Sequence, residues 1–141
     1  MNEIILNQSQ LDTLTEHALK SGQNESCAML LGIHEEGSWN VKEIFLTQNA
    51  DGNPRVEFTI SPDELLSGYK HAEEKHLKLV GIFHSHPESL AAPSNTDKKF
   101  MMLNGEVPWI IFSGLTTDFK AFILKEEVEA VSYTHLRAHE T

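Results

Sequence analysis

The sequence predicts an α/β fold in which a mixed sheet is combined with helices. Three observations favour this class. Several apolar runs have the length of strands, other segments carry apolar residues at helical spacing, and the two kinds of element alternate without a strict βαβ rhythm. The 141 residues suit one domain, and we find no internal repeat or low-complexity segment.

Two helices are expected in the first half of the chain. Residues 7–22 carry leucine and alanine at helical spacing, with Ser9 expected at the N-cap and Gly22 expected to end the helix. Residues 61–76 show a sharper start, because Ser61 precedes a proline and is followed three residues later by a glutamate. The second pattern predicts a complete capping box.

The apolar runs between these segments predict the strands of the sheet. The expected strands are residues 26–33, 39–46, 55–60, 77–83, 107–114 and 118–124. A third, short helix is expected at residues 94–103.

Composition limits the classes of partner and the cellular compartment. The formal net charge of −10 argues against nucleic acid or an anionic membrane surface, because both require clustered Lys and Arg. Cys27 is the single cysteine, so no internal disulfide can form. No basic segment followed by an apolar core is present at the N-terminus, and no apolar run is long enough to span a bilayer. A cytoplasmic protein is expected.

The last stretch of the chain differs from the rest. Residues 131–141, VSYTHLRAHET, do not continue the preceding strand pattern and resemble a translated sequencing adapter. We therefore expect one domain at residues 1–130, followed by a non-native tail that replaces the natural C-terminus.

The segment GIFHSHPESLAAPSNTD holds the densest group of chemically active side chains. Because residues i and i+2 of a strand share a face, His84 and His86 are expected to point the same way, and Ser85 the opposite way. Two imidazoles so arranged can bind one zinc ion, at Zn–N distances of about 2.0–2.1 Å. A third ligand should leave one coordination position open in a catalytic site.

Asp97 is the best candidate for the third ligand. Ser94 starts the expected short helix, and Asp97 lies one turn into it on the same side. Two histidines and one carboxylate form a hydrolytic zinc set. The S-x-x-D pattern of residues 94–97 also fits an ordinary capping box, so both interpretations stay open.

A hydrolytic site also needs a group that moves protons. Glu25 could be that acid/base, because a carboxylate has no packing reason to precede the apolar strand at residues 26–33. The hydroxyl of Ser94 could donate to the developing oxyanion. Cys27 lies among apolar neighbours and is expected to be a buried structural thiol rather than a nucleophile.

These elements, in this order, resemble the JAMM (MPN-plus) metalloprotease family. Its signature is an upstream Glu, then H-[ST]-H-P, then S-x-x-D, here Glu25, residues 84–87 and residues 94–97. The resemblance spans about residues 2–125 and is closest to compact prokaryotic, archaeal-like members. It implies a mixed, curved sheet flanked by helices, the architecture of cytidine deaminases.

The resemblance also implies the chemistry. One zinc ion would be held by His84, His86 and Asp97, with Glu25 as general acid/base and Ser94 as oxyanion support. The substrate would be a ubiquitin-like modifier or a sulfur-carrier protein, cleaved after its C-terminal Gly-Gly. Two alternatives stay open: a peptidase that releases an amino acid from a sulfur carrier, and a non-catalytic MPN scaffold that only binds partners.

Overall fold

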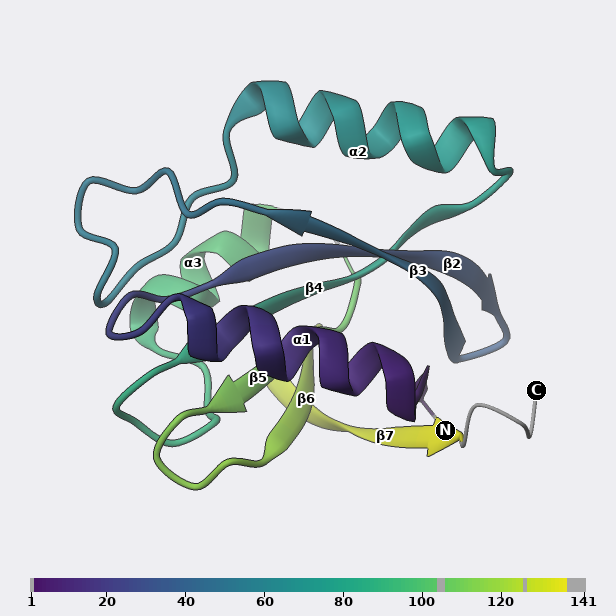
Figure 1. Cartoon of the computed structure of the whole chain (residues 1–141). Helices are drawn as coiled ribbons and strands as arrows, with labels where there is room; N and C mark the ends of the chain where they lie inside the picture. Colours follow the sequence, from purple (N-terminus) through teal and green to yellow (C-terminus); the bar gives the residue numbers. More distant parts are fainter. Residues whose placement is uncertain (1, 104–105, 126, 137–141) are drawn as a thin grey trace.

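The computed structural model describes residues 2–103, 106–125 and 127–136 (Figure 1). Along the chain the elements are β1 (Glu3–Asn7), α1 (Gln8–Lys20), β2 (Cys27–Glu35), β3 (Ser38–Thr47), α2 (Pro62–Glu74), β4 (Lys78–His86), α3 (Asn95–Leu103), β5 (Trp109–Ser113), β6 (Phe119–Leu124) and β7 (Val128–Leu136). Strands and helices mix, so the predicted α/β class is confirmed. None of the described helices is long and apolar enough to cross a membrane.

The sheet is closed, whereas a curved sheet flanked by helices was expected. The strand order is β1-β3-β2-β4-β5-β6-β7, and β1 returns to pair with β7 in parallel. Parallel pairs also join β1 to β3 and β4 to β5, and the remaining neighbours are antiparallel. The two strands that close the barrel, β1 and β7, are absent from the sequence prediction, which explains the difference.

Strand β7 extends into the segment expected to be a non-native tail. It runs to Leu136, and its backbone pairs with β6 up to Val131 and with β1 from Ser132 onward. Residues 131–136 therefore continue a strand, although their sequence shows no pattern that continues the preceding one. Residues 137–141 lie outside the described residues. The origin of this segment stays a prediction.

Alternation along β2 separates two apolar layers. Ala28 and Leu30 pack with α1 in the main core, to which every strand contributes a buried side chain. Met29 and Leu31, on the opposite face, pack with Ala72 of α2. Helices α1 and α2 therefore lie on opposite faces of the sheet, as Figure 1 shows. The strands between them hold the histidine segment in place.

The predicted helix starts are partly correct. Helix α1 is capped by Asn7 rather than Ser9, because Asn7 and Gln10 exchange side-chain-to-backbone hydrogen bonds in a capping box. Ser61 caps α2 as expected and accepts from the N–H of Glu64. The Glu64 side chain, however, accepts from the N–H of Gln48, so the predicted capping box is only half formed.

Residues 55–60 are not a strand, which corrects the sequence prediction. The N–H groups of Val56 and Glu57 donate to the carbonyl of Asn53 and form a turn, while the N–H of Thr59 donates to the Asn49 side chain. Phe58 is buried and packs outside the sheet in a second apolar cluster, with Ile82, Met101 and Trp109. Tertiary packing outweighs the strand propensity of this segment.

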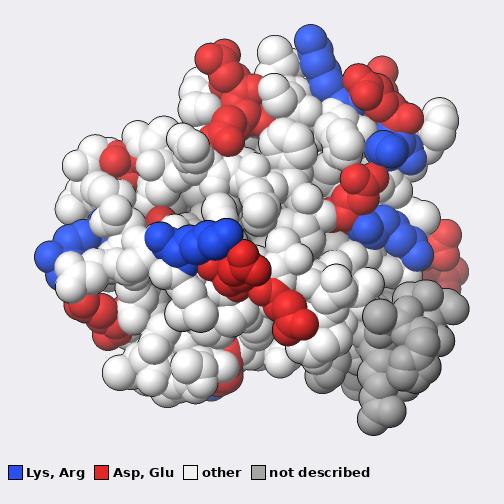
Figure 2. Space-filling view, in the orientation of Figure 1, with Lys and Arg blue, Asp and Glu red and all other residues white. Residues whose placement is uncertain are grey.

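Charged side chains of both signs are interspersed over the face shown in Figure 2. Lys20 and Glu16, four residues apart on α1, form one such exposed pair at 2.7 Å. The whole chain carries a net charge of −10. A protein partner in preference to nucleic acid stays a prediction.

Candidate metal centre

His84 and His86 end strand β4, which lies between β2 and β5 in the sheet. Both side chains are buried, and their Nε2 atoms lie 3.1 Å apart. Strand geometry thus turns the two rings toward one point, as the i, i+2 spacing predicts. The hydroxyl of Ser85, between them, instead accepts a hydrogen bond from the N–H of Ser26 at 2.9 Å.

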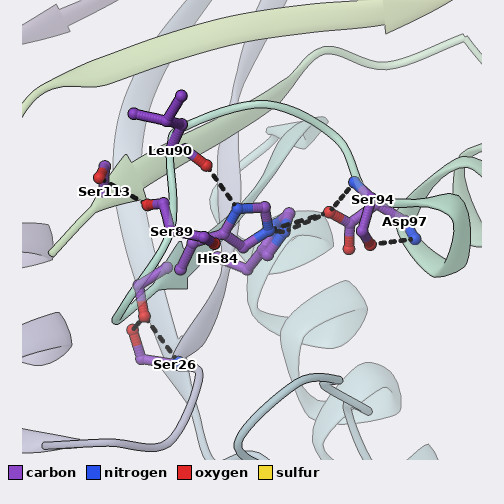
Figure 3. Close-up of polar contacts among 9 residues, drawn as sticks. Ser26, His84, Ser89, Leu90, Ser94, Asp97 and Ser113 are labelled. Carbon is purple, nitrogen blue, oxygen red and sulfur yellow. Dashed lines mark hydrogen bonds and ion pairs between the residues drawn. The ribbon is translucent and has the colours of Figure 1, made fainter. Parts of the chain in front are cut away.

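Asp97 reaches the two imidazoles from the first turn of α3. Its Oδ2 atom lies 3.0 Å from Nε2 of His84 and 3.0 Å from Nε2 of His86 (Figure 3). The same oxygen accepts from the N–H of Ser94, whose hydroxyl accepts from the N–H of Asp97. Asp97 therefore takes part in the capping box and also contacts both histidines. The capping hydrogen bonds fix the orientation of its carboxylate.

Glu25 joins this group from a distant part of the sequence. It precedes β2, which pairs with β4 so that Cys27 lies opposite His84. Four residues can each supply one ligand atom: Glu25, His84, His86 and Asp97. These four atoms lie within 4.8 Å of one another. The side chain of Glu25 is buried, and its Oε1 atom has no hydrogen-bond partner among the described residues. A buried carboxylate oxygen without a partner lowers stability, so its presence indicates a functional role.

Burial and hydrogen bonding set the protonation of the cluster. Burial raises the pKa of Glu25 to about 8, and burial lowers the pKa of His84. Burial also opposes the charged forms of Asp97 and His86, but the hydrogen bonds between them outweigh it. The pKa of Asp97 is therefore held well below its usual range, and the pKa of His86 is raised. The cluster thus holds a carboxylate that attracts positive charge.

Two observations show that a cation fits this cluster. The Nδ1 atom of His86 lies 2.8 Å from the carbonyl of Leu90, which can only accept, so Nδ1 carries the hydrogen. Loss of the Nε2 proton that bonds Asp97 would leave a lone pair on Nε2 directed at the cluster, as in metal-binding histidines. Ligands at about 2.0–2.1 Å from one tetrahedral ion lie about 3.4 Å apart. The observed separations of 3.0 and 3.1 Å are close to that spacing.

Aromatic side chains wall the cluster on one side. The ring of Phe58 stacks on His84 with a centroid distance of 4.7 Å, and Trp109 meets the same ring edge-on at 5.6 Å. Phe58 and Trp109 also line an apolar cavity of about 150 Å³. An apolar wall lowers the local dielectric and so strengthens electrostatic interactions within the site.

A polar cleft adjoins the cluster. Glu25, His86 and Ser94 lie along it, and its volume is about 530 Å³. Arg55 and Glu88 face each other across its rim at 3.8 Å. Glu25 and His86 are thus both members of the cluster and part of the wall of this cleft.

Cys27 lies outside this chemistry. Its thiol is buried, accepts a hydrogen bond from the hydroxyl of Thr47 at 3.2 Å, and has its pKa raised by burial to about 11. A neutral thiol is a poor nucleophile. The predicted burial of Cys27 is confirmed.

Sequence reasoning missed two groups that shape the site. Phe58 was placed in a strand, yet its ring packs on His84. Asn49 lies outside the predicted helices and strands, yet its side chain donates to the carbonyl of Glu25 at 2.9 Å. An asparagine three residues after the end of a predicted strand is the signal that could have pointed to such a contact, because its amide readily bonds nearby backbone.

A barrel that carries two histidines, an aspartate and a buried glutamate in one cluster is typical of a metal-dependent hydrolase. The family of prokaryotic homologs of the JAB domain matches residues 7–125, and the chain belongs to this family. The predicted resemblance to JAMM proteases is thereby confirmed.

Named relatives agree with this assignment. The chain is 33% identical over 109 residues to a Desampylase from Pyrococcus furiosus, an overlap of 77% of this chain and 73% of the relative. It is 30% identical over 119 residues to a Probable TtuB-protein conjugate cleaving protease from Thermus thermophilus, covering 84% and 74%. The predicted enzyme class, a hydrolytic protease, is confirmed by the family and these relatives.

Solved structures agree with the fold. Protein DSY2949 from Desulfitobacterium hafniense superposes with a TM-score of 0.86 at 26% identity, covering 97% of this chain and 95% of that one. A protein from Salinibacter ruber superposes with a TM-score of 0.68 at 22% identity, covering 100% and 94%, and supports the fold alone.

Proposed function

We propose that this chain is a zinc-dependent isopeptidase that hydrolyses the bond after the C-terminal Gly-Gly of a ubiquitin-like modifier. The observation that carries the proposal is the buried, unpartnered Oε1 of Glu25 beside the two histidines and Asp97. The names of the relatives, Desampylase and conjugate cleaving protease, support a protein conjugate as the substrate.

The donor set supports zinc as the metal. His84, His86 and Asp97 offer two imidazoles and one carboxylate, whereas calcium and magnesium prefer oxygen ligands alone. When bound, zinc supplies a Lewis acid for the scissile carbonyl and activates water near neutral pH. Iron can use the same donor set, so the metal that copurifies with the chain is a direct test.

Glu25 and Ser94 carry out the proton transfer and the oxyanion stabilisation. Glu25 accepts a proton from the attacking water at its carboxylate oxygen and then delivers it to the leaving amine. A cation held by the histidines and Asp97 would lower the raised pKa of Glu25 and so keep it ionised for this role. The Ser94 hydroxyl accepts from the Asp97 N–H, which leaves its own hydrogen free to donate to the developing oxyanion. Glycines at the scissile position suit this cleft, because they let the backbone approach the buried cluster closely.

Replacement of Glu25 tests the proposal directly. Glu25→Gln should retain zinc, measured by elemental analysis, and should lose turnover of a Gly-Gly-tailed modifier conjugate by at least about 10²–10⁴-fold. Turnover within tenfold of the wild type would contradict the assigned acid/base. A carrier with one amino acid after the Gly-Gly, run in parallel, tests the alternative of amino-acid release. A wild type that binds zinc but cleaves neither substrate would favour the non-catalytic scaffold.

Replacement of Asp97 tests the ligand set. Asp97→Ala should lose most zinc affinity, whereas a role in capping alone would cost only about 1 kcal/mol of stability. Zinc titration and thermal unfolding, measured on the same preparation, separate the two roles. Wild-type zinc affinity in a destabilised variant would show that Asp97 is a cap and not a ligand.

A further inference from the structure

The backbone of Glu25 is held by the loop between β3 and α2. The N–H of Glu25 donates to the carbonyl of Pro54 at 2.7 Å, and the Glu25 carbonyl accepts from the side-chain amide of Asn49 at 2.9 Å. Both backbone groups therefore bond to the same loop, just before β2 begins. Within the described part of the chain, no hydrogen bond holds the Oε1 atom of the Glu25 side chain.

Asn49 is the centre of that loop. Its Nδ2 donates to the carbonyls of Glu25 and, at 2.8 Å, of Glu57. Its Oδ1 accepts from the N–H of Asp51 at 3.0 Å and from the N–H of Thr59 at 3.1 Å. The side chain thus uses both donors and both lone pairs, and it ties the two ends of the loop to the residue that precedes β2.

The same loop also contacts the metal cluster from its other side. Phe58, one residue after a carbonyl that Asn49 binds, stacks on the ring of His84. The loop therefore spans from Glu25 to His84. A shift of this loop would change the distance between the proton-transferring carboxylate and the histidines, on which the reaction rate depends steeply.

We infer that Asn49 is a positioning residue that sets the placement of the Glu25 carboxylate against the metal ligands. The inference rests on the proposed function of Glu25. The proposed metal ligands lie on β4 and α3. Among the described residues, no hydrogen bond joins the Asn49 side chain to either element. The inference therefore concerns the rate of the chemical step and not the binding of the metal.

Two variants separate the contacts of Asn49. Asn49→Ala removes all of its hydrogen bonds. Asn49→Asp keeps the oxygen that accepts from Asp51 and Thr59 but replaces the donor to Glu25 by a second acceptor. A misplacement of about 1 Å can cost about 10²-fold in rate, so kcat should fall about 10- to 100-fold in both variants. KM and zinc affinity should stay within about twofold of the wild type.

Thr59→Val is the matched control. It removes the 2.6 Å hydrogen bond from the Thr59 hydroxyl to Asp51 and loosens the same loop, but it leaves the contact between Asn49 and Glu25 intact. Its kcat should stay within about twofold of the wild type. An equal loss in this control would show that general loop rigidity, and not the asparagine, determines the rate.

Combination with Glu25→Gln shows whether Asn49 acts through Glu25. If it does, Asn49→Asp should cause no further loss of turnover in the Glu25→Gln background. Three results would each overturn the inference. They are an additional 10- to 100-fold loss of turnover in the Glu25→Gln background, a kcat of the single Asn49 variants within twofold of wild type, and a parallel loss of zinc affinity.

Amide hydrogen exchange gives a readout that does not depend on activity. The N–H of Glu25 should exchange at least tenfold faster in Asn49→Ala and Asn49→Asp, while the N–H groups of β4 keep their wild-type rates. Unchanged exchange at Glu25 would overturn the inference. A wild type without zinc-dependent cleavage would instead contradict the proposed function, and the exchange rates would then decide the role of Asn49 alone.

Discussion

Gly114 offers a test of how tightly the histidine segment is held. It follows β5, and its N–H donates to the carbonyl of His86 at 2.8 Å. A Cβ atom at this position would lie 3.0 Å from the carbonyl carbon and 3.1 Å from the Cα of Pro87, and closer still to the Pro87 oxygen. Gly114→Ala should therefore displace the backbone that directly follows a proposed metal ligand.

The size of the effect follows from these distances. Non-bonded carbon atoms prefer separations of about 3.5–4.0 Å, so the two backbones must move apart by about 0.5–1 Å. Metal sites tolerate changes of only about 0.2 Å in ligand distance. Changes in the surroundings of a ligand typically cost about 10- to 100-fold in metal affinity. We expect a loss of that size for zinc in Gly114→Ala.

Competition with a chromophoric chelator measures the zinc affinity, and circular dichroism shows whether the variant is folded. Gly52→Ala is the control, because a Cβ on Gly52 meets nothing within 4 Å and should leave zinc affinity unchanged. A folded Gly114→Ala protein that binds zinc within about twofold of the wild type would refute the reasoning. It would show that the segment after His86 shifts without moving the ligands.

Two further predictions concern groups near the cluster. The thiol of Cys27, buried and with its pKa raised to about 11, should resist Ellman's reagent at pH 8 in the native protein and react once urea unfolds the chain. Rapid native labelling would contradict its burial. Ser85→Ala should lower the free energy of unfolding by about 1–3 kcal/mol, because the buried N–H of Ser26 loses its acceptor. A loss below about 0.5 kcal/mol in urea denaturation would show that another acceptor replaces the hydroxyl.

The sequence predicted the parts of the site that depend on local geometry. The spacing of His84 and His86 is a property of any strand, and the distance from Ser94 to Asp97 is a property of any helix start. Both arrangements can therefore be read without knowledge of the fold. The structure brings these side chains together with Glu25, and the variants above test the role assigned to each.

Features that depend on long-range packing could not be predicted in the same way. The β-rich composition of residues 55–60 indicates a strand, but burial of Phe58 against His84 imposes an irregular path. Strand β1 has only five residues, and β7 pairs with it across almost the whole chain. A strand as short as β1 leaves little periodic signal, and most of β7 lies in the segment assigned to a tail, so closure of the barrel was missed.

The spacing of the cluster along the chain has a consequence for biosynthesis. Three of its members lie between residues 84 and 97, a short segment whose ends come together at small entropic cost. The fourth, Glu25, joins them only when β2 pairs with β4. A nascent or partly denatured molecule could thus capture the ion before it gains any ability to cut proteins. Such an order would keep incompletely folded copies harmless to the conjugates around them.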